Sequence, residues 1–169
     1  PYRTEGGVKF TDHHVQSPLL NIANSCAVCH RWSEDELRGR VEGIQTKVSE
    51  AMLQAEEALV HAHFDVAAAK QAGASDDDLK AARSLIRGAQ FRWDYVSATN
   101  GMGFHSAQES TRLLGEAANL AQQARVDAAR LLGRLGVTAI PRYPDVSTRQ
   151  KAWDVAQAFV EADGVRLLH

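Results

Sequence analysis

The pentapeptide Cys26-Ala27-Val28-Cys29-His30 is the most specific chemical signature in the sequence. Two cysteines separated by two residues and followed at once by a histidine form the attachment signature of a c-type haem. Both thiols become thioethers to the vinyl groups of one porphyrin, and the histidine is the proximal iron ligand. Cys26 and Cys29 are the only cysteines, which disfavours a structural zinc site with a second ligand pair. A redox dithiol, a disulfide across the turn and a chance match remain as alternatives.

Besides His30 and the terminal His169, five histidines are possible ligands, and their spacing distinguishes them. His13 and His14 are neighbours on an extended segment, so they point to opposite sides and at most one can address a given iron. His61 and His63 lie two apart on a predicted helix, on different faces, and cannot chelate one metal as an i, i+4 pair could. His105 follows a glycine-rich break, where a turn can deliver an imidazole to a pocket. Spacing alone leaves His13 and His105 as candidates, with solvent-exposed or hydrogen-bonded roles as the alternative.

Composition and charge narrow the class of protein. The 169 residues are 44% hydrophobic with a net charge of -2, which fits one domain that can bury a core. No basic block indicates nucleic-acid binding, and no apolar run reaches the roughly 18 residues of a membrane span. The sequence begins at Pro1 without a methionine or a signal peptide, so we expect a mature product or an excised piece. Covalent haem attachment is an export-side chemistry in bacteria, and an export signal would then lie upstream.

The N-terminal 32 residues are expected to form a haem-attachment segment. Residues 1–15 contain Gly6-Gly7 and alternate little, which predicts an extended, irregular lead-in. Ser17-Pro18 then has the pattern of a helix start, with serine as N-cap and proline at the first helical position. This helix would lead into the haem motif.

Residues 33–169 have an almost wholly helical pattern. Apolar residues recur at steps of three and four from Leu37 to Val66, which predicts one helix of about 38 residues and on the order of 55 Å. A stripe of that length usually meets another long helix in the same chain or in a second subunit. Further helices are expected over about 75–99, 106–135 and 147–163, with a proline-containing connector over 137–146. Capping-box patterns occur at Ser33, Ser106 and Ser147, and a weaker one at Ser75. The predicted fold is all-α, a bundle of long antiparallel helices after an irregular lead-in.

Together these stretches resemble the C-terminal part of ammonia-forming cytochrome c nitrite reductases, over essentially the whole chain. The resemblance rests on Thr11-Asp12-His13, the motif Cys26 to His30, Val60-His61-Ala62-His63-Phe64, Arg92-Trp93-Asp94 and Gly103-Phe104-His105. Members of that family are periplasmic enzymes with five c-type haems that form homodimers through long helices. The resemblance implies that Cys26 and Cys29 hold the last haem and that His30 is its proximal ligand. It also implies that His13 and His105 are distal ligands of two other haems, a role it does not give to His14.

The resemblance also implies what this chain lacks. The catalytic haem of the family is held by Cys-x-x-Cys-Lys, which does not occur here, and its substrate pocket and calcium site would lie before Pro1. The chain therefore resembles about the last third of the enzyme and is not expected to reduce nitrite alone. Nitrite reduction to ammonium takes six electrons, and the implied partners are the upstream part of the enzyme, a second copy and a quinol-linked multihaem donor.

Two other hypotheses remain at this stage. A small self-contained electron-transfer cytochrome would hold one haem with both axial ligands from this chain. A haem-free helical dimerisation module would keep free thiols at Cys26 and Cys29.

Overall fold

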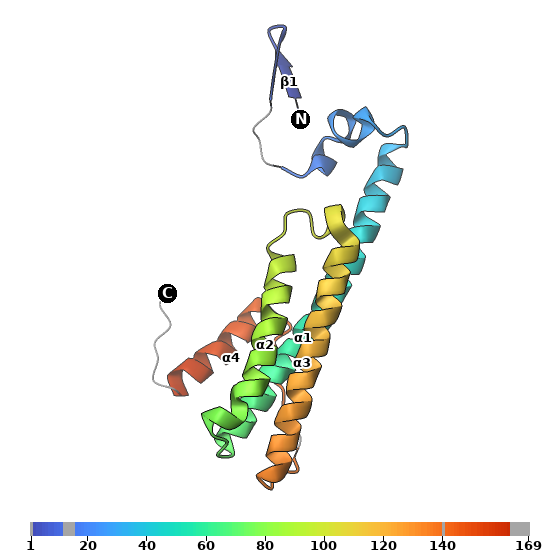
Figure 1. Cartoon of the computed structure of the whole chain (residues 1–169). Coiled ribbons are helices and arrows are strands. Elements are labelled where there is room, and N and C mark those ends of the chain that lie inside the picture. Colours follow the sequence, from blue (N-terminus) through green and yellow to red (C-terminus); the bar gives the residue numbers. More distant parts are fainter. Residues whose placement is uncertain (1, 12–15, 140, 163–169) are drawn as a thin grey trace.

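Three long helices form the body of the protein in the computed structural model, which describes residues 2–11, 16–139 and 141–162. They are α1 (Glu34–Gln71), α2 (Asp76–Ser97) and α3 (Ala107–Arg134), each antiparallel to the next along the chain (Figure 1). A shorter α4 (Arg149–Ala162) follows an extended connector and crosses beside the bundle. The predicted all-α fold class is confirmed.

Helix α1 is continuous for 38 residues, as the apolar stripe predicted. It begins at a complete capping box, in which the Ser33 hydroxyl accepts from the Glu36 amide and the Glu36 carboxylate accepts from the Ser33 amide. It ends where Gly73 adopts a positive φ of 99° and its amide donates to the Lys70 carbonyl. Glycine adopts this conformation at little cost, which makes it the usual residue just past a helix end.

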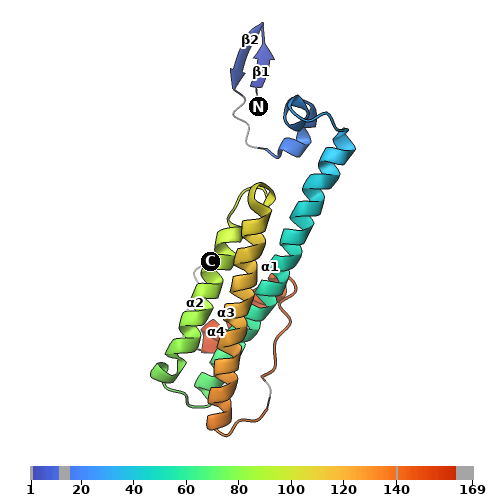
Figure 2. The same cartoon turned by 45° about the vertical axis from the view of Figure 1, so that its right-hand side comes forward.

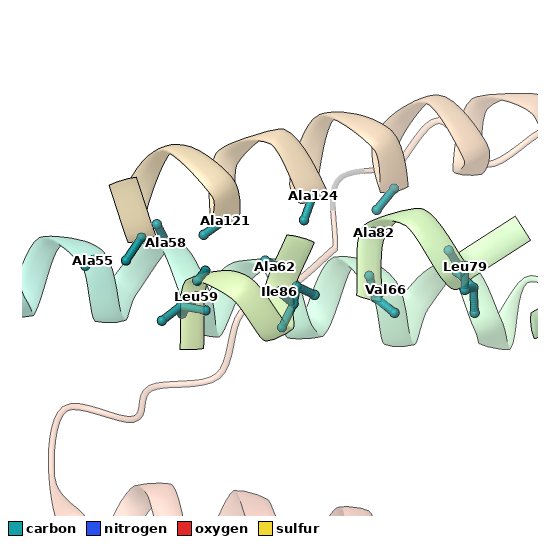
Figure 3. Packing of buried hydrophobic residues seen from close by; sticks show 14 of the residues in the cluster. Ala55, Ala58, Leu59, Ala62, Val66, Leu79, Ala82, Ile86, Ala121 and Ala124 are labelled. Carbon is teal, nitrogen blue, oxygen red and sulfur yellow. The ribbon is translucent and has the colours of Figure 1, made fainter. Parts of the chain in front are cut away.

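Small side chains line the contact between the three helices. Figure 3 shows alanines of α1 facing alanines of α3, with Ala58 and Ala121 opposite one another. The fully buried alanines, with 0% exposure, are Ala55, Ala62, Ala69, Ala89, Ala117, Ala121 and Ala124. Because a methyl group is the whole side chain, the helix axes can approach closely. Larger residues such as Leu79 and Leu114 fill the space beside this seam and are also fully buried.

The first turns of α1 extend beyond α2 and α3, which is visible in both views (Figures 1 and 2). The N-terminal segment lies against this free end in three short 3-10 turns, η1 (Pro18–Leu20), η2 (Ile22–Asn24) and η3 (Cys26–Val28). Ile22 of η2 is 2% exposed, and Leu37 and Val41 of α1 are buried at this end, outside the main core. Ser17 caps η1 as predicted, but the expected helix is broken into three turns.

A β-hairpin precedes these turns. Strands β1 (Tyr2–Glu5) and β2 (Val8–Thr11) pair antiparallel, with Glu5 opposite Val8. Gly6 and Gly7 both have positive φ angles, 57° and 81°, which a two-residue hairpin turn of this kind requires. The lead-in is extended as predicted and its residues 3–11 are exposed, but the pairing of its two strands was not predicted.

The helix starts differ from prediction at three serines. Ser75 forms a complete capping box with Asp78, stronger than expected. The boxes predicted at Ser106 and Ser147 are wrong. Ser106 belongs to the 3-10 turn η4 (Phe104–Ser106) and makes no capping bond. At α4 the Thr148 hydroxyl accepts from the Lys151 amide instead, because the Ser147 amide donates to the Asp145 carboxylate.

The connector after α3 is fixed to the bundle by a buried carboxylate. Asp65 of α1 is 5% exposed and accepts hydrogen bonds from Arg125 Nε at 3.0 Å and from the Tyr143 hydroxyl at 2.7 Å. Arg125 also donates from Nη2 to the Tyr143 oxygen at 3.1 Å. The His61 ring stacks on the Tyr143 ring with centroids 3.8 Å apart. These contacts join α1, α3 and the connector.

Replacing Tyr143 with phenylalanine should lower the free energy of unfolding by about 1–3 kcal/mol, since it removes a hydrogen bond to a buried carboxylate. Chemical denaturation at pH 7 measures this loss. Thr138→Val is the control, because Thr138 is an exposed residue of the same connector and should change stability by less than about 0.5 kcal/mol. Equal stabilities of Tyr143→Phe and the wild type would contradict the conclusion that the Tyr143 hydroxyl holds the connector to the bundle.

The same variant tests a pH dependence. Burial, followed by the hydrogen bond to Asp65, raises the pKa of Tyr143 above its ordinary value of 10.0. A raised folded-state pKa gives stability that is present below about pH 10 and lost as the pH rises through the folded-state pKa. The wild type should therefore lose stability above pH 10 more steeply than Tyr143→Phe.

Candidate functional site

The two cysteines lie on one side of a tight turn. Cys26 begins the 3-10 turn η3, and its carbonyl accepts from the Cys29 amide at 3.2 Å and the His30 amide at 3.0 Å. Residues i and i+3 of a 3-10 turn eclipse one another, so Cys26 and Cys29 emerge on the same side. Both are free thiols, Cys26 partly buried and Cys29 exposed. The turn therefore presents two thiols and the adjacent imidazole of His30 together, as thioether attachment and iron ligation require.

Hydrogen bonds fix this turn to the protein. The Ser25 hydroxyl lies 2.9 Å from the Pro18 carbonyl and 2.8 Å from the Asn21 carbonyl and donates to them. Arg38 of α1 donates from Nη2 to the Leu19 carbonyl at 3.0 Å. The Ser25 bonds thus hold the turn to the preceding residues of its own segment, and the Arg38 bond holds that segment to the free end of α1.

The surroundings of the turn suit a porphyrin. Val28, between the cysteines, is 70% exposed, and Leu20 in the preceding turn is 73% exposed. Exposed apolar side chains beside two free thiols are the surface that a large flat apolar ring would cover. The His30 ring stacks on the Trp32 ring, and Arg40 lies over the Trp32 ring. Sequence reasoning did not identify Trp32 or Arg40, because no spacing rule links them to the motif.

His105 is placed by a tightly packed glycine turn. Gly103 has a φ of 73°, and a Cβ there would lie 2.8 Å from Val48 Cγ2 and 3.1 Å from Ser110 Oγ. The preceding Gly101 carbonyl accepts from Gln45 Nε2 of α1 at 3.0 Å. His105 follows on η4 and is exposed, with its ring edge-on to Phe104. The prediction that a turn rather than a helix positions His105 is correct.

The structure does not bring His105 to the haem motif. Its turn is held at Gln45, the twelfth residue of α1, which is about 17 Å along the axis from the helix start. His105 is therefore held well apart from the turn that carries His30, and its role as the distal ligand of another haem stays a prediction. His13 and His14 lie outside the described residues.

The other motif residues have structural roles. His61 stacks on Tyr143, and His63 is on another face of α1, as their spacing predicted. Burial lowers the pKa of His63 below its ordinary value. Trp93 donates from its ring nitrogen to the Met52 carbonyl at 3.1 Å and so links α2 to α1. Arg92 pairs with Glu116 at 2.9 Å and links α2 to α3.

Among the residues that the structure describes, no group of three or more histidines, cysteines, aspartates or glutamates is arranged to hold a metal ion by itself. None of the described helices has the length and apolar character needed to cross a membrane.

Free thiols and an imidazole on one turn, carried by a bundle of long helices, define the class of c-type cytochromes. Residues 1–165 match the cytochrome c552 family, and the chain belongs to that family.

Relatives and a solved structure agree with this assignment. The chain is 45% identical over 152 residues to cytochrome c-552 of Parabacteroides distasonis. The matched region covers 90% of this chain and 31% of that protein. The chain is 42% identical over 156 residues to cytochrome c-552 of Maridesulfovibrio salexigens, covering 92% of this chain and 31% of that protein. The chain thus spans about a third of the length of these relatives.

The similar structure is the catalytic subunit of cytochrome c nitrite reductase from Desulfovibrio desulfuricans, described with two calcium sites. The TM-score is 0.70 at 32% identity, over 76% of this chain and 28% of that one. The resemblance to nitrite reductases seen in the sequence is therefore confirmed.

Replacing Gly103 with alanine should destabilise the protein by about 2–4 kcal/mol, from the left-handed backbone and the overlap with Val48 together. Thermal unfolding measures the loss. Gly115→Ala is the control, because Gly115 lies in α3 with open space around it, and alanine there should stabilise by roughly 0.5–1 kcal/mol. A Gly103→Ala protein as stable as the wild type would contradict the account of how His105 is positioned.

Proposed function

We propose that this chain is the C-terminal part of a periplasmic multihaem cytochrome c nitrite reductase. In this role residues 1–32 attach one haem through Cys26 and Cys29, with His30 as the proximal ligand, and residues 33–169 provide the helical body and the pairing surface. The observation that carries the proposal is the η3 turn, which presents both thiols and His30 together. The family and the similar nitrite reductase structure support it.

The attached haem would supply one-electron redox chemistry. His30 would hold the iron from one side, while the hydrogen-bonded turn and the free end of α1 hold His30. His105, on its separate turn, is proposed as the distal ligand of another haem, and His13 as that of a third. Substrate nitrite, calcium and the catalytic haem would belong to the rest of the enzyme, so we propose that the chain alone is inactive. A quinol-linked multihaem protein is the proposed electron donor.

Intact mass and visible spectra test the haem site. The chain should be secreted by a host that attaches c-type haem, and its mass should rise by one haem, with a c-type absorption band on reduction. The double variant Cys26→Ser, Cys29→Ser should lose the covalent haem completely, because no thiol remains for the thioethers.

His63→Ala is the matched control, because this histidine on α1 is not proposed to bind iron, and the variant should keep the haem. A bare polypeptide mass for the wild type in that host would contradict the proposed site.

We also propose that two copies pair through the long helices. Large apolar side chains are exposed on them, including Leu53 on α1 (62%) and Phe91 (68%) and Tyr95 (57%) on α2. Phe91 and Tyr95 are four residues apart and share one helix face. A face of this kind usually meets a partner.

Sedimentation equilibrium should show a dimer for the wild type and a weaker one for the double variant Phe91→Ser, Tyr95→Ser. Removing two apolar anchors from an interface should weaken pairing by 10-fold or more, on the order of 2 kcal/mol. Gln123→Ser, an exposed change on α3, which carries none of the named anchors, should leave pairing unchanged. A wild-type monomer at high concentration would contradict the proposal.

A further inference from the structure

Trp32 is a large aromatic residue that belongs to no hydrophobic core and is 44% exposed. Its ring lies nearly parallel to that of His30, with centroids 5.1 Å apart and planes inclined by 7°. The central guanidinium carbon of Arg40 lies 4.1 Å from the centroid of the Trp32 ring. One face of the Trp32 indole is thus stacked with the imidazole proposed as the proximal ligand, and the charged guanidinium of Arg40 also lies over the indole.

The backbone fixes these three side chains relative to one another. Trp32 immediately precedes Ser33, whose capping box sets the first residue of α1. Arg40 follows two turns into the same helix, so its position is determined once the helix start is set. The Arg38 bond to the Leu19 carbonyl ties that helix to the segment that bears the thiols. Arg40 and the helix start that follows Trp32 are therefore both set by α1.

We propose that Trp32 and Arg40 are positioning residues for the iron ligand His30, an inference that rests on the proposed haem site. A coordinated imidazole can rotate about its bond to the metal, and a parallel ring against it restricts that rotation. Neighbours of a metal ligand commonly set its orientation and tune the metal in this way. Trp32 restrains the plane of the His30 ring, and Arg40 holds the indole in place through a cation–π contact.

Arg40 has a second effect through its charge. A guanidinium stays protonated at all ordinary pH values. The oxidised haem iron carries one more positive charge than the reduced iron, so a nearby fixed cation disfavours the oxidised form. Arg40 therefore raises the reduction potential of the haem attached to Cys26 and Cys29.

Redox titration and electron paramagnetic resonance of the haem-loaded chain test both roles. Arg40→Gln should shift the midpoint potential to a more negative value, and Arg40→Lys should restore most of it because it keeps the charge. Trp32→Ala should change the g-values of the oxidised haem, which report the orientation of the axial ligand, and Trp32→Phe should retain most of the wild-type spectrum.

Lys47→Gln is the matched control. It removes the same charge from α1 seven residues further along the helix, about 10 Å away along the axis, and should shift the potential less than Arg40→Gln. Equal shifts for the two variants, or unchanged g-values in Trp32→Ala, would overturn the inference while leaving the haem site intact. If the wild type takes up no haem, the proposed function fails, and this inference fails with it.

Discussion

Close packing of α1 against α3 and α2 through buried alanines is the constraint on which the rest of the structure depends. Because these side chains end at Cβ, the helices can pack closely, and the contact tolerates little added volume. Residues of α1 from Val48 to Ala69 pack in the common core, which fixes the rotation of this helix relative to α2 and α3. Both turns that carry candidate ligands contact this helix. The haem segment is bonded to its free end, and the His105 turn contacts Gln45 and Val48.

The haem turn does not share the main core. Ile22, Leu37 and Val41 are buried at the free end of α1, apart from the cluster that joins the three helices. This small patch and two sets of hydrogen bonds hold the segment, and the apolar residues Leu20 and Val28 stay exposed. A bound porphyrin would bury this surface and would stabilise the segment that carries the two cysteines.

Local features of the fold could be predicted from the sequence, and contacts between distant residues could not. The 38-residue helix and the glycine turn before His105 depend on residues close in sequence, and these predictions are confirmed. The predicted caps at Ser106 and Ser147 were wrong. Ser106 is part of the 3-10 turn η4, and the Ser147 amide donates to the Asp145 carboxylate. The Asp65 cluster joins residues 60 and 78 positions apart, and no periodic pattern marks such a contact.

Because α1 is one continuous helix, the number of its residues sets the distance and rotation between the haem turn and the His105 turn. A one-residue insertion between Ser33 and Gln45 would turn everything before it by about 100° and move it by about 1.5 Å, since the helix has 3.6 residues per turn. Seven added residues would nearly restore the rotation of the haem turn about the helix axis. They would still separate the haem turn and the His105 turn by about a further 10 Å. This stretch can therefore accept substitutions on its exposed side far more readily than it can accept any change in the number of its residues.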